Sequence, residues 1–282
     1  MGIRNQLLGM TFLFAVAGCS SIETETNADQ KETKKEEPSA VVTKQEEEKD
    51  TPTDSYVKTD NSLEGIGYLM ERELESKKKE QKETPDLIDA PVIAQMPELP
   101  RGCEVATLAM MLGQAGIEVS KMTLAEEVRK DPTPYSKKNG QVYFGNPNTG
   151  FVGNMYTFDK PGYGVYNEPI ADLAREYLGE RVINLSGNNF DAVLNQIDKG
   201  KPVWVVNTSL FKRLPESYWR TWNTPTGKVK ITYKMHSVLI TGYDEDYIYF
   251  NDALANQKNR KSSRNNFVAG WEQFGKQAVS YN

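Results

Sequence analysis

Hydrophobic periodicity and capping signals predict four helices between residues 91 and 282. Residues 103–115 carry an apolar stripe at helical spacing and are followed by a glycine stop. The capping box Thr123-Leu-Ala-Glu126 opens a second, short helix. Two further helices are predicted over 169–178 and 190–198, each with a glycine soon after its last residue.

Alternating and continuous apolar runs predict strands in the C-terminal part of the chain. Residues 202–206 form an apolar run typical of a buried strand, and Val229, Ile231 and Tyr233 alternate with polar residues. Residues 236–243 and 247–252 flank a polar turn at 244–246 and predict a hairpin. Helices early and strands late indicate an α+β domain with a helical part packed on an antiparallel sheet.

The stretch from Asp131 to Tyr166 is rich in Gly, Pro, Asn and Tyr and has no helical period. A loop of this length in a compact domain is usually functional or disordered. Its aromatic residues favour a functional loop. Four of them are candidates either for lining a cleft or for plain packing: Tyr143, Phe144, Phe151 and Tyr156.

The first 19 residues have the pattern of an export signal. One basic residue, Arg4, precedes an apolar run over 7–18, which is too short to cross a bilayer. Ala17 and Gly18 before Cys19 resemble a bacterial lipobox. This predicts a lipoprotein whose Cys19 is lipidated and anchors the chain to the cell membrane on its extracytoplasmic face. An ordinary secretory signal is the alternative.

Residues 20–90 are acidic and poor in apolar residues. They hold 20 acidic and 11 basic residues, a net charge of −9, with Tyr56 and Tyr68 as their aromatics. Such a segment cannot bury enough surface to offset the entropy of ordering it, so we expect a disordered tether. Apolar residues recur at helical spacing over 63–74, which indicates either a transient helix or a regulatory segment.

Composition narrows the chemistry of the remaining domain, 91–282. With two cysteines and one histidine in 282 residues we expect no Cys/His zinc site and no other cofactor. The two cysteines could form at most one disulfide, and none if either of them has another role. The domain carries 22 basic and 19 acidic residues, and nothing in that balance points to nucleic acid. We expect a monomer. The basic run over 258–264 is read as a solvated loop or as a contact for anionic wall polymer or lipid headgroups.

Cys103 is the candidate nucleophile. If Cys19 carries the lipid, Cys103 is the remaining thiol, and it lies in the first turn of a predicted helix. The helix dipole and Arg101 nearby should favour the reactive thiolate. A small buried cysteine with a packing role is the alternative.

His236, the sole histidine, follows Cys103 by 133 residues, within the range typical of papain-type enzymes. A hairpin with its loop at 243–245 pairs His236 directly with Asp252, whose carboxylate would then orient the imidazole. A slip of one residue would turn Asp252 away. Rivals for the third position are Asn251, Asp244 and Asp246. Gln95, eight residues before Cys103, can supply an amide to an oxyanion hole.

Several segments together resemble the C39-like family of bacterial papain-fold cysteine peptidases. They are Gln95-Met-Pro-Glu-Leu-Pro-Arg-Gly-Cys103-Glu-Val-Ala-Thr-Leu-Ala-Met-Met-Leu, Val142 to Gly153, Met235-His236-Ser-Val-Leu-Ile-Thr-Gly-Tyr-Asp244, Tyr249-Phe-Asn-Asp252-Ala-Leu and Ala269 to Gly275. Ala253 departs from the family, which usually has proline there.

The resemblance implies a papain-like α+β fold and a peptide or protein substrate. It implies Cys103 as nucleophile, His236 as base, Asp252 as orienting residue and Gln95 in the oxyanion hole. Two other functions remain open: a non-catalytic module that binds peptide or cell-wall strands, and a cell-wall hydrolase of another papain-like branch.

Overall fold

The computed structural model describes residues 70, 72 and 85–282. The predictions for the signal peptide, Cys19 and most of the tether, including the helix at 63–74, fall largely outside these residues. Within the described residues, no helix combines the length and the apolar character needed to span a membrane.

The described chain contains five α-helices, two short 3-10 helices and twelve strands. The helices are α2 (Cys103–Gln114), α3 (Lys121–Glu127), α4 (Asn167–Leu178), η1 (Gly179–Arg181), α5 (Phe190–Asp198), η2 (Glu216–Tyr218) and α6 (Arg264–Glu272). The strands are β1 (Lys130–Asp131), β2 (Ser136–Lys138), β3 (Gln141–Tyr143), β4 (Phe151–Val152), β5 (Val182–Asn184), β6 (Val203–Thr208), β7 (Arg220–Thr224), β8 (Gly227–Ile231), β9 (Met235–Tyr243), β10 (Tyr247–Asp252), β11 (Gln257–Ser263) and β12 (Ala278–Tyr281).

The four predicted helices are present, and one of them begins earlier than its capping box suggested. The side chain of Ser120 accepts a hydrogen bond from the Thr123 backbone N–H, so Ser120 is the N-cap of α3 and Thr123 lies inside the helix. In the same way Asn189 caps α5 by accepting from Ala192 N–H.

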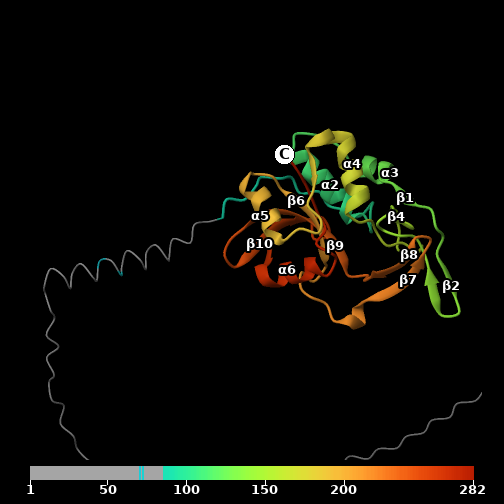
Figure 1. The fold of residues 1–282 in the computed structure, drawn as a ribbon. Coiled ribbons are helices and arrows are strands. Elements are labelled where there is room, and N and C mark those ends of the chain that lie inside the picture. The colour runs from blue at the N-terminus through green and yellow to red at the C-terminus, as the bar shows by residue number, and fades with distance from the viewer. Residues whose placement is uncertain (1–69, 71, 73–84) are drawn as a thin grey trace, which may run out of the picture. The chain divides into compact units, whose positions relative to one another are not determined.

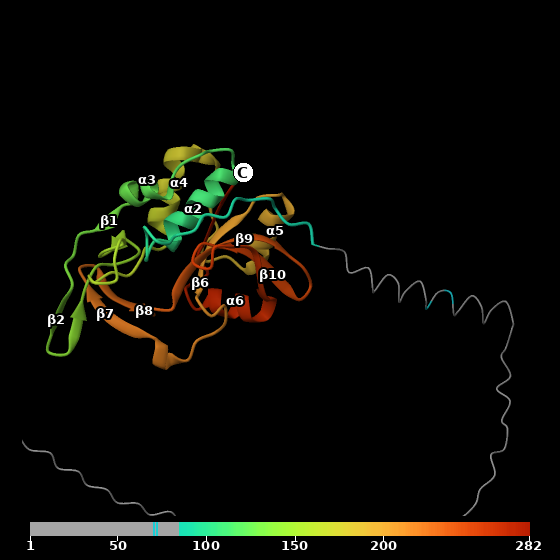
Figure 2. The same ribbon diagram turned by 180° about the vertical axis from the view of Figure 1, so that it is seen from behind.

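The central sheet has six strands in the order β11-β10-β9-β6-β12-β5, and every neighbouring pair is antiparallel. Helices cover both faces. Trp204 and Val206 of β6 pack in the apolar cluster that contains α2, α3 and α4, whereas Val203 and Val205 pack with α5 and α6. Figures 1 and 2 show α2, α3 and α4 together on one side of this sheet and α6 on the other.

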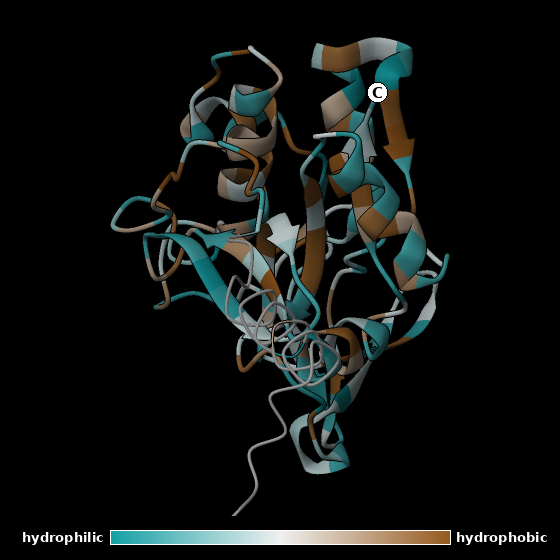
Figure 3. Ribbon diagram, turned by 90° about the vertical axis from the view of Figure 1, so that its left-hand side faces the viewer, coloured by the Kyte–Doolittle hydropathy of each residue, from teal (hydrophilic) through white to brown (hydrophobic). Residues whose placement is uncertain are grey.

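Because helices cover both faces, the middle strands read as continuous apolar runs rather than as alternating ones. All six residues of β6 are buried. In Figure 3 long hydrophobic stretches of strand run through the middle of the fold, between helices on either side. The predicted α+β class is confirmed, and the second helical layer of α5 and α6 extends it.

A smaller sheet, β2-β3-β7-β8, lies beside the main one. Its first two strands come from the stretch that we read as a loop over 131–166, so that prediction was incomplete. Strands of two or three residues are too short to show a period. The strand predicted from the alternation at 229–233 was also too long at its C-terminal end, because β8 ends at Ile231.

Residues assigned to the end of the tether pack on the central sheet, which corrects that boundary. Ile88 N–H donates to Thr241 O at 2.8 Å, and Ala90 is fully buried. The Asn251 side chain donates to the backbone oxygens of Ala90 and Pro91, both at 3.0 Å. We call residues 86–95 the N-terminal strap, since they run over β9 and β10 and end at Gln95.

The basic run over 258–264 is not a loop. Most of it belongs to strand β11, which pairs antiparallel with β10. Lys258 forms an ion pair with Asp89 of the strap, and Arg260 forms one with Asp252. Two of its basic side chains are therefore paired with carboxylates of the same protein.

Candidate active site

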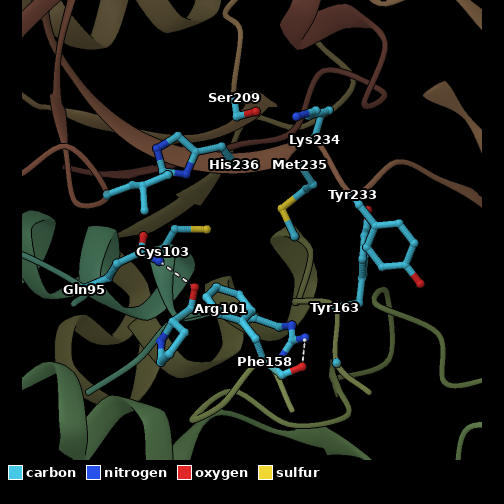
Figure 4. Close-up of a pocket in the computed structure, with 13 residues that line it drawn as sticks. Gln95, Arg101, Cys103, Phe158, Tyr163, Ser209, Tyr233, Lys234, Met235 and His236 are labelled. Carbon is cyan, nitrogen blue, oxygen red and sulfur yellow. Dashed lines mark hydrogen bonds between the residues drawn. The ribbon is translucent and has the colours of Figure 1, made fainter. Parts of the chain in front are cut away.

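A pocket of about 330 Å³ opens where the start of α2 meets the start of β9. Gln95, Cys103 and His236 all line it, although they lie far apart in the sequence. Figure 4 shows the His236 ring beside the Cys103 side chain, with Gln95 below them. The fold thus brings together three of the four residues that the sequence singled out, and Asp252 lies behind His236.

Cys103 is the first residue of α2 and the one free cysteine in the described part of the chain. Gly102 allows the tight approach before it, because a Cβ at that position would collide with the Leu99 side chain. The residue Cys103 is 7% exposed, and its thiol donates a hydrogen bond to Glu104 Oε2 at 3.2 Å.

The expected preference for the thiolate is wrong for this arrangement. Burial, followed by the charge of Glu104, raises the pKa of the Cys103 thiol well above its ordinary value. A backbone hydrogen bond from Ser237 acts in the opposite direction but is outweighed. The helix N-terminus therefore does not by itself ionise this thiol.

Arg101 holds one wall of the pocket. Its guanidinium donates to the backbone oxygens of Asn154, Thr157 and Phe158 and lies 4.8 Å from the centre of the Phe158 ring. These contacts fix the segment 154–158 at the pocket rim (Figure 4). Arg101 thus shapes the site through backbone contacts, and not through the thiol as we expected.

The aromatic residues that line the pocket differ from the four predicted ones. They are Phe158, Tyr163 and Tyr233. Phe144 and Phe151 are buried in the core instead. None of the four predicted residues lines this pocket, because the composition of the stretch could not show which rings face it.

His236 and Asp252 are in direct contact. His236 Nε2 lies 2.8 Å from Asp252 Oδ1, and both side chains are almost fully buried. Since Nε2 is occupied by the carboxylate, Nδ1 is the ring nitrogen left for a proton from Cys103. This is the arrangement in which a carboxylate fixes the tautomer and orientation of a catalytic imidazole.

The contact forms through a register other than the predicted one. Strand β10 pairs Asn251 with Leu239, after a register shift between Tyr249 and Phe250. If this pairing continues by one residue, Asp252 lies opposite the β9 residue that is two positions from His236. The side chains of Asp252 and His236 are then on the same face of the sheet and are diagonal neighbours within reach of each other. Without the shift Asp252 would point to the opposite face.

Asp252 is held as a carboxylate from several directions. Oδ1 also accepts Leu254 N–H at 2.9 Å and Ala255 N–H at 3.2 Å, and Oδ2 accepts from Arg260 at 2.8 Å. Burial raises its pKa, but the hydrogen bond and charge of His236, together with the hydrogen bonds from Ala255 and Arg260, outweigh burial and bring the pKa to about 2. Asp252 is therefore ionised at any pH near neutral.

The three rivals of Asp252 have other positions. Asn251 points to the N-terminal strap and also accepts Asn259 N–H at 2.9 Å. Asp244 lies in the hairpin turn at the other end of β9, where its carboxylate accepts the N–H groups of Asp246 and Tyr247. Neither turn aspartate is among the residues that line the pocket.

Gln95 lies at the pocket with its amide fixed by backbone oxygens. Its Nε2 donates to Pro100 O at 2.9 Å (Figure 4) and to Leu99 O at 3.4 Å. Its own N–H bonds Ala253 O at 2.9 Å, which ties Gln95 to the residue after Asp252. Its Oε1 is buried and has no hydrogen-bond partner among the described residues.

Glu104 is a site residue that our sequence interpretation missed. It is 1% exposed, and its carboxylate accepts both the Cys103 S–H and Val165 N–H, the latter at 2.8 Å. Burial raises its pKa to about 7. A glutamate within the apolar run of α2 was the available signal, because ionisable residues are rarely buried without a partner.

No group of three or more His, Cys, Asp or Glu side chains within residues 70, 72 and 85–282 is arranged to hold a metal ion. The pocket and the residues in contact with it offer a thiol, an imidazole, two carboxylates and an amide.

Residues 87–279 match the Peptidase_C39 like family, which covers more than half of the chain. The chain belongs to this C39-like family. It is 46% identical over 204 residues to the uncharacterized protein YvpB of Bacillus subtilis (strain 168), across 72% of this chain and 78% of that protein.

A crystal structure of a candidate C39-like peptidase from Bacillus anthracis superposes with a TM-score of 0.66 at 42% identity. The match covers 71% of this chain and 98% of that one. The papain-like α+β fold implied by the sequence resemblance is therefore that of a C39-like domain, and Ala253 in place of the usual proline is compatible with it.

Proposed function

We propose that this protein is a cysteine peptidase that hydrolyses peptide bonds through Cys103, His236 and Asp252. The observation that carries the proposal is the 2.8 Å contact between His236 and Asp252 beside the Cys103 thiol. Membership of a family named for peptidases supports the reaction class. Its substrate is a peptide or protein.

The chemistry proceeds in two halves. His236 Nδ1 takes the Cys103 proton, the thiolate attacks the scissile carbonyl, and a tetrahedral oxyanion forms. The imidazolium then gives that proton to the leaving amine, and a thioester to Cys103 remains. Water, deprotonated by His236, attacks the thioester; the acid product leaves and Cys103 regains its proton.

The oxyanion needs donors at the pocket wall. The backbone N–H of Cys103 is available, because the first N–H groups of a helix have no partner within it. Gln95, at the end of the N-terminal strap, is the proposed second donor. Its Nε2 donates to Pro100 O and Leu99 O in this structure, so it serves the oxyanion once one of these N–H groups turns to the substrate. Loss of one oxyanion donor costs on the order of 10²- to 10³-fold in rate in acyl-transfer enzymes.

A second candidate function is binding of peptide or cell-wall strands without hydrolysis. The neutral, buried thiol and its hydrogen bond to Glu104 favour it, since a thiol held in this way is not a nucleophile. Retention of His236, Asp252 and Gln95 around that thiol argues for the peptidase.

The export signal and Cys19 lead us to propose that either activity operates at the extracytoplasmic face of the membrane.

The test is cleavage of a mixed peptide library by the full-length protein, followed by mass spectrometry of the products. We expect defined cleavages that are absent with Cys103→Ala and with His236→Ala, while the thermal unfolding midpoints stay close to that of the wild type. Identical cleavage by Cys103→Ala would contradict the proposal. Retention of library peptides without cleavage by the wild type would support the binding function.

A further inference from the structure

Glu104 is a buried ionisable group in contact with the nucleophile, and the reaction sketched above does not use it. Its two carboxylate oxygens have separate partners. Oε1 is fixed by Val165 N–H, and Oε2 receives the Cys103 thiol proton. The carboxylate is thus the hydrogen-bond acceptor of the Cys103 thiol in this structure.

The space around Glu104 is shaped to its side chain. Gly164 lies against it, and a Cβ at that position would collide with Glu104 Oε1 and with the end of Met235. The backbone oxygen of Glu104 is also used, since it accepts from Trp204 Nε1 at 3.0 Å. The carboxylate is therefore held next to the sulfur with little freedom to turn away.

The ionisable groups that face Glu104 are Cys103 from α2 and the Tyr163–Tyr166 pair from the preceding loop of α4. The two tyrosine hydroxyls are 2.9 Å apart, and burial raises the pKa of both, so they stay neutral. His236 and its partner Asp252 also lie near the thiol. The charge of Asp252 raises the pKa of the Cys103 thiol further and so disfavours the thiolate.

We propose that Glu104 controls the protonation state of the nucleophile: as a carboxylate it accepts the Cys103 S–H and keeps the thiol neutral, and as a carboxylic acid it donates to the thiolate. The proposal rests on the proposed role of Cys103. Protonation of Glu104 removes a negative charge beside the sulfur and supplies a donor to it, so both effects favour the thiolate.

Such a group makes the site respond to pH near neutrality. Because burial raises the Glu104 pKa to about 7, the carboxylic acid is present below that pH and the carboxylate above it. The pKa of the Cys103 thiol is therefore lower while Glu104 is protonated than after Glu104 has ionised, although the thiolate fraction itself still rises with pH. Titrations of Cys103 and Glu104 are coupled, so the pair is observed as one pH profile.

The test is the rate at which iodoacetamide alkylates Cys103 between pH 5 and pH 9, followed by the mass of the Cys103 peptide from the full-length protein. Glu104→Gln imitates the protonated acid, because its oxygen can accept from Val165 and its amide can donate to the thiolate. We expect Glu104→Gln to react about tenfold faster than the wild type at pH 8, equivalent to one unit of thiol pKa.

At pH 5.5 the two proteins should differ by less than about twofold, because Glu104 is then protonated in the wild type. Glu118→Gln makes the same chemical change at an exposed position after α2 and should leave the wild-type profile unchanged. If the ratio of the alkylation rates of Glu104→Gln and the wild type is the same at every pH, the proposal is overturned and Glu104 has a structural role only.

A second variant keeps the test informative if Glu104→Gln does not fold. In Gly164→Ala the added Cβ collides with Glu104 Oε1 and displaces the carboxylate from its present hydrogen bonds, so the rate of alkylation at pH 8 should differ from that of the wild type. An unchanged profile in folded Gly164→Ala would count against Glu104 control. Because alkylation needs no peptide substrate, the result is separate from the peptidase test: altered profiles without any library cleavage would support Glu104 control and contradict hydrolysis.

Discussion

The two adjacent residues at the end of β10 point their side chains to different parts of the protein. Asp252 faces His236, and Asn251 faces the N-terminal strap, where it donates to the backbone oxygens of the buried Ala90 and of Pro91. The alternation of a strand separates the two side chains. One position therefore serves the proposed chemistry, and its neighbour holds the segment that carries Gln95.

We predict that Asp252→Asn lowers the rate of peptide cleavage by about 10²- to 10⁴-fold, because the amide no longer fixes the required imidazole tautomer. Asn251→Ala should instead lower the free energy of unfolding by about 1–3 kcal/mol, since the buried Ala90 carbonyl loses its side-chain donor and the Pro91 carbonyl loses one too. Urea unfolding and cleavage rates distinguish the two. Wild-type activity in Asp252→Asn, together with a folded but inactive Asn251→Ala, would reverse the assignment.

At the scale of elements, the hairpin β9–β10 was predictable because both strands are long and apolar. Its register was not, since a shift between Tyr249 and Phe250 arises from local geometry that no residue pattern announces. The side of the strand on which Asp252 lies was nevertheless correct. An error of two positions in register keeps the same face, whereas an error of one does not.

Strand β11 contributes a positioning residue through Arg260, which bonds Asp252 Oδ2 and lies over the Phe211 ring. We predict that Arg260→Ala lowers kcat about tenfold with little change in KM, because small misplacements of catalytic groups reduce the chemical step. Lys258→Ala removes a cation from the same strand, where its partner Asp89 is exposed.

Lys258→Ala should therefore keep the wild-type kcat and serves as the control for Arg260→Ala. Restoration of activity by Arg260→Lys would support a charge-dependent role, and its pH profile should lie between those of the wild type and Arg260→Ala. Equal kcat values for Arg260→Ala and Lys258→Ala would show that Arg260 does not position Asp252.

At the scale of the whole molecule, the sequence revealed the long elements and the residues with unusual chemistry. The helices and long strands have enough residues to show a period, and Cys103 and His236 stood out by scarcity. The short strands of the small sheet, the strap and Glu104 were not predicted, although Glu104 had a sequence signal as a glutamate within an apolar run. Each depends on contacts between distant segments, such as Gln95 with Ala253 or Glu104 with Val165.

The export and anchoring of the chain remain a prediction from residues 1–19. We expect the protein purified from the membrane fraction to begin at Cys19 and to carry a lipid there, as intact mass would show. Cys19→Ala should leave the membrane fraction, because a single apolar run of this length does not span a bilayer. An unmodified wild-type chain in the secreted fraction would contradict the anchor and favour an ordinary secretory signal.

The central claim is that Cys103 carries out the hydrolysis. The full-length protein is alkylated in steps by iodoacetamide. At each step the modified fraction of Cys103 is measured, and cleavage is assayed with the best peptide from the library as substrate. We predict that activity falls in proportion to the fraction of Cys103 modified and reaches zero when all of it is alkylated. Cleavage that persists after complete modification of Cys103 would contradict the account.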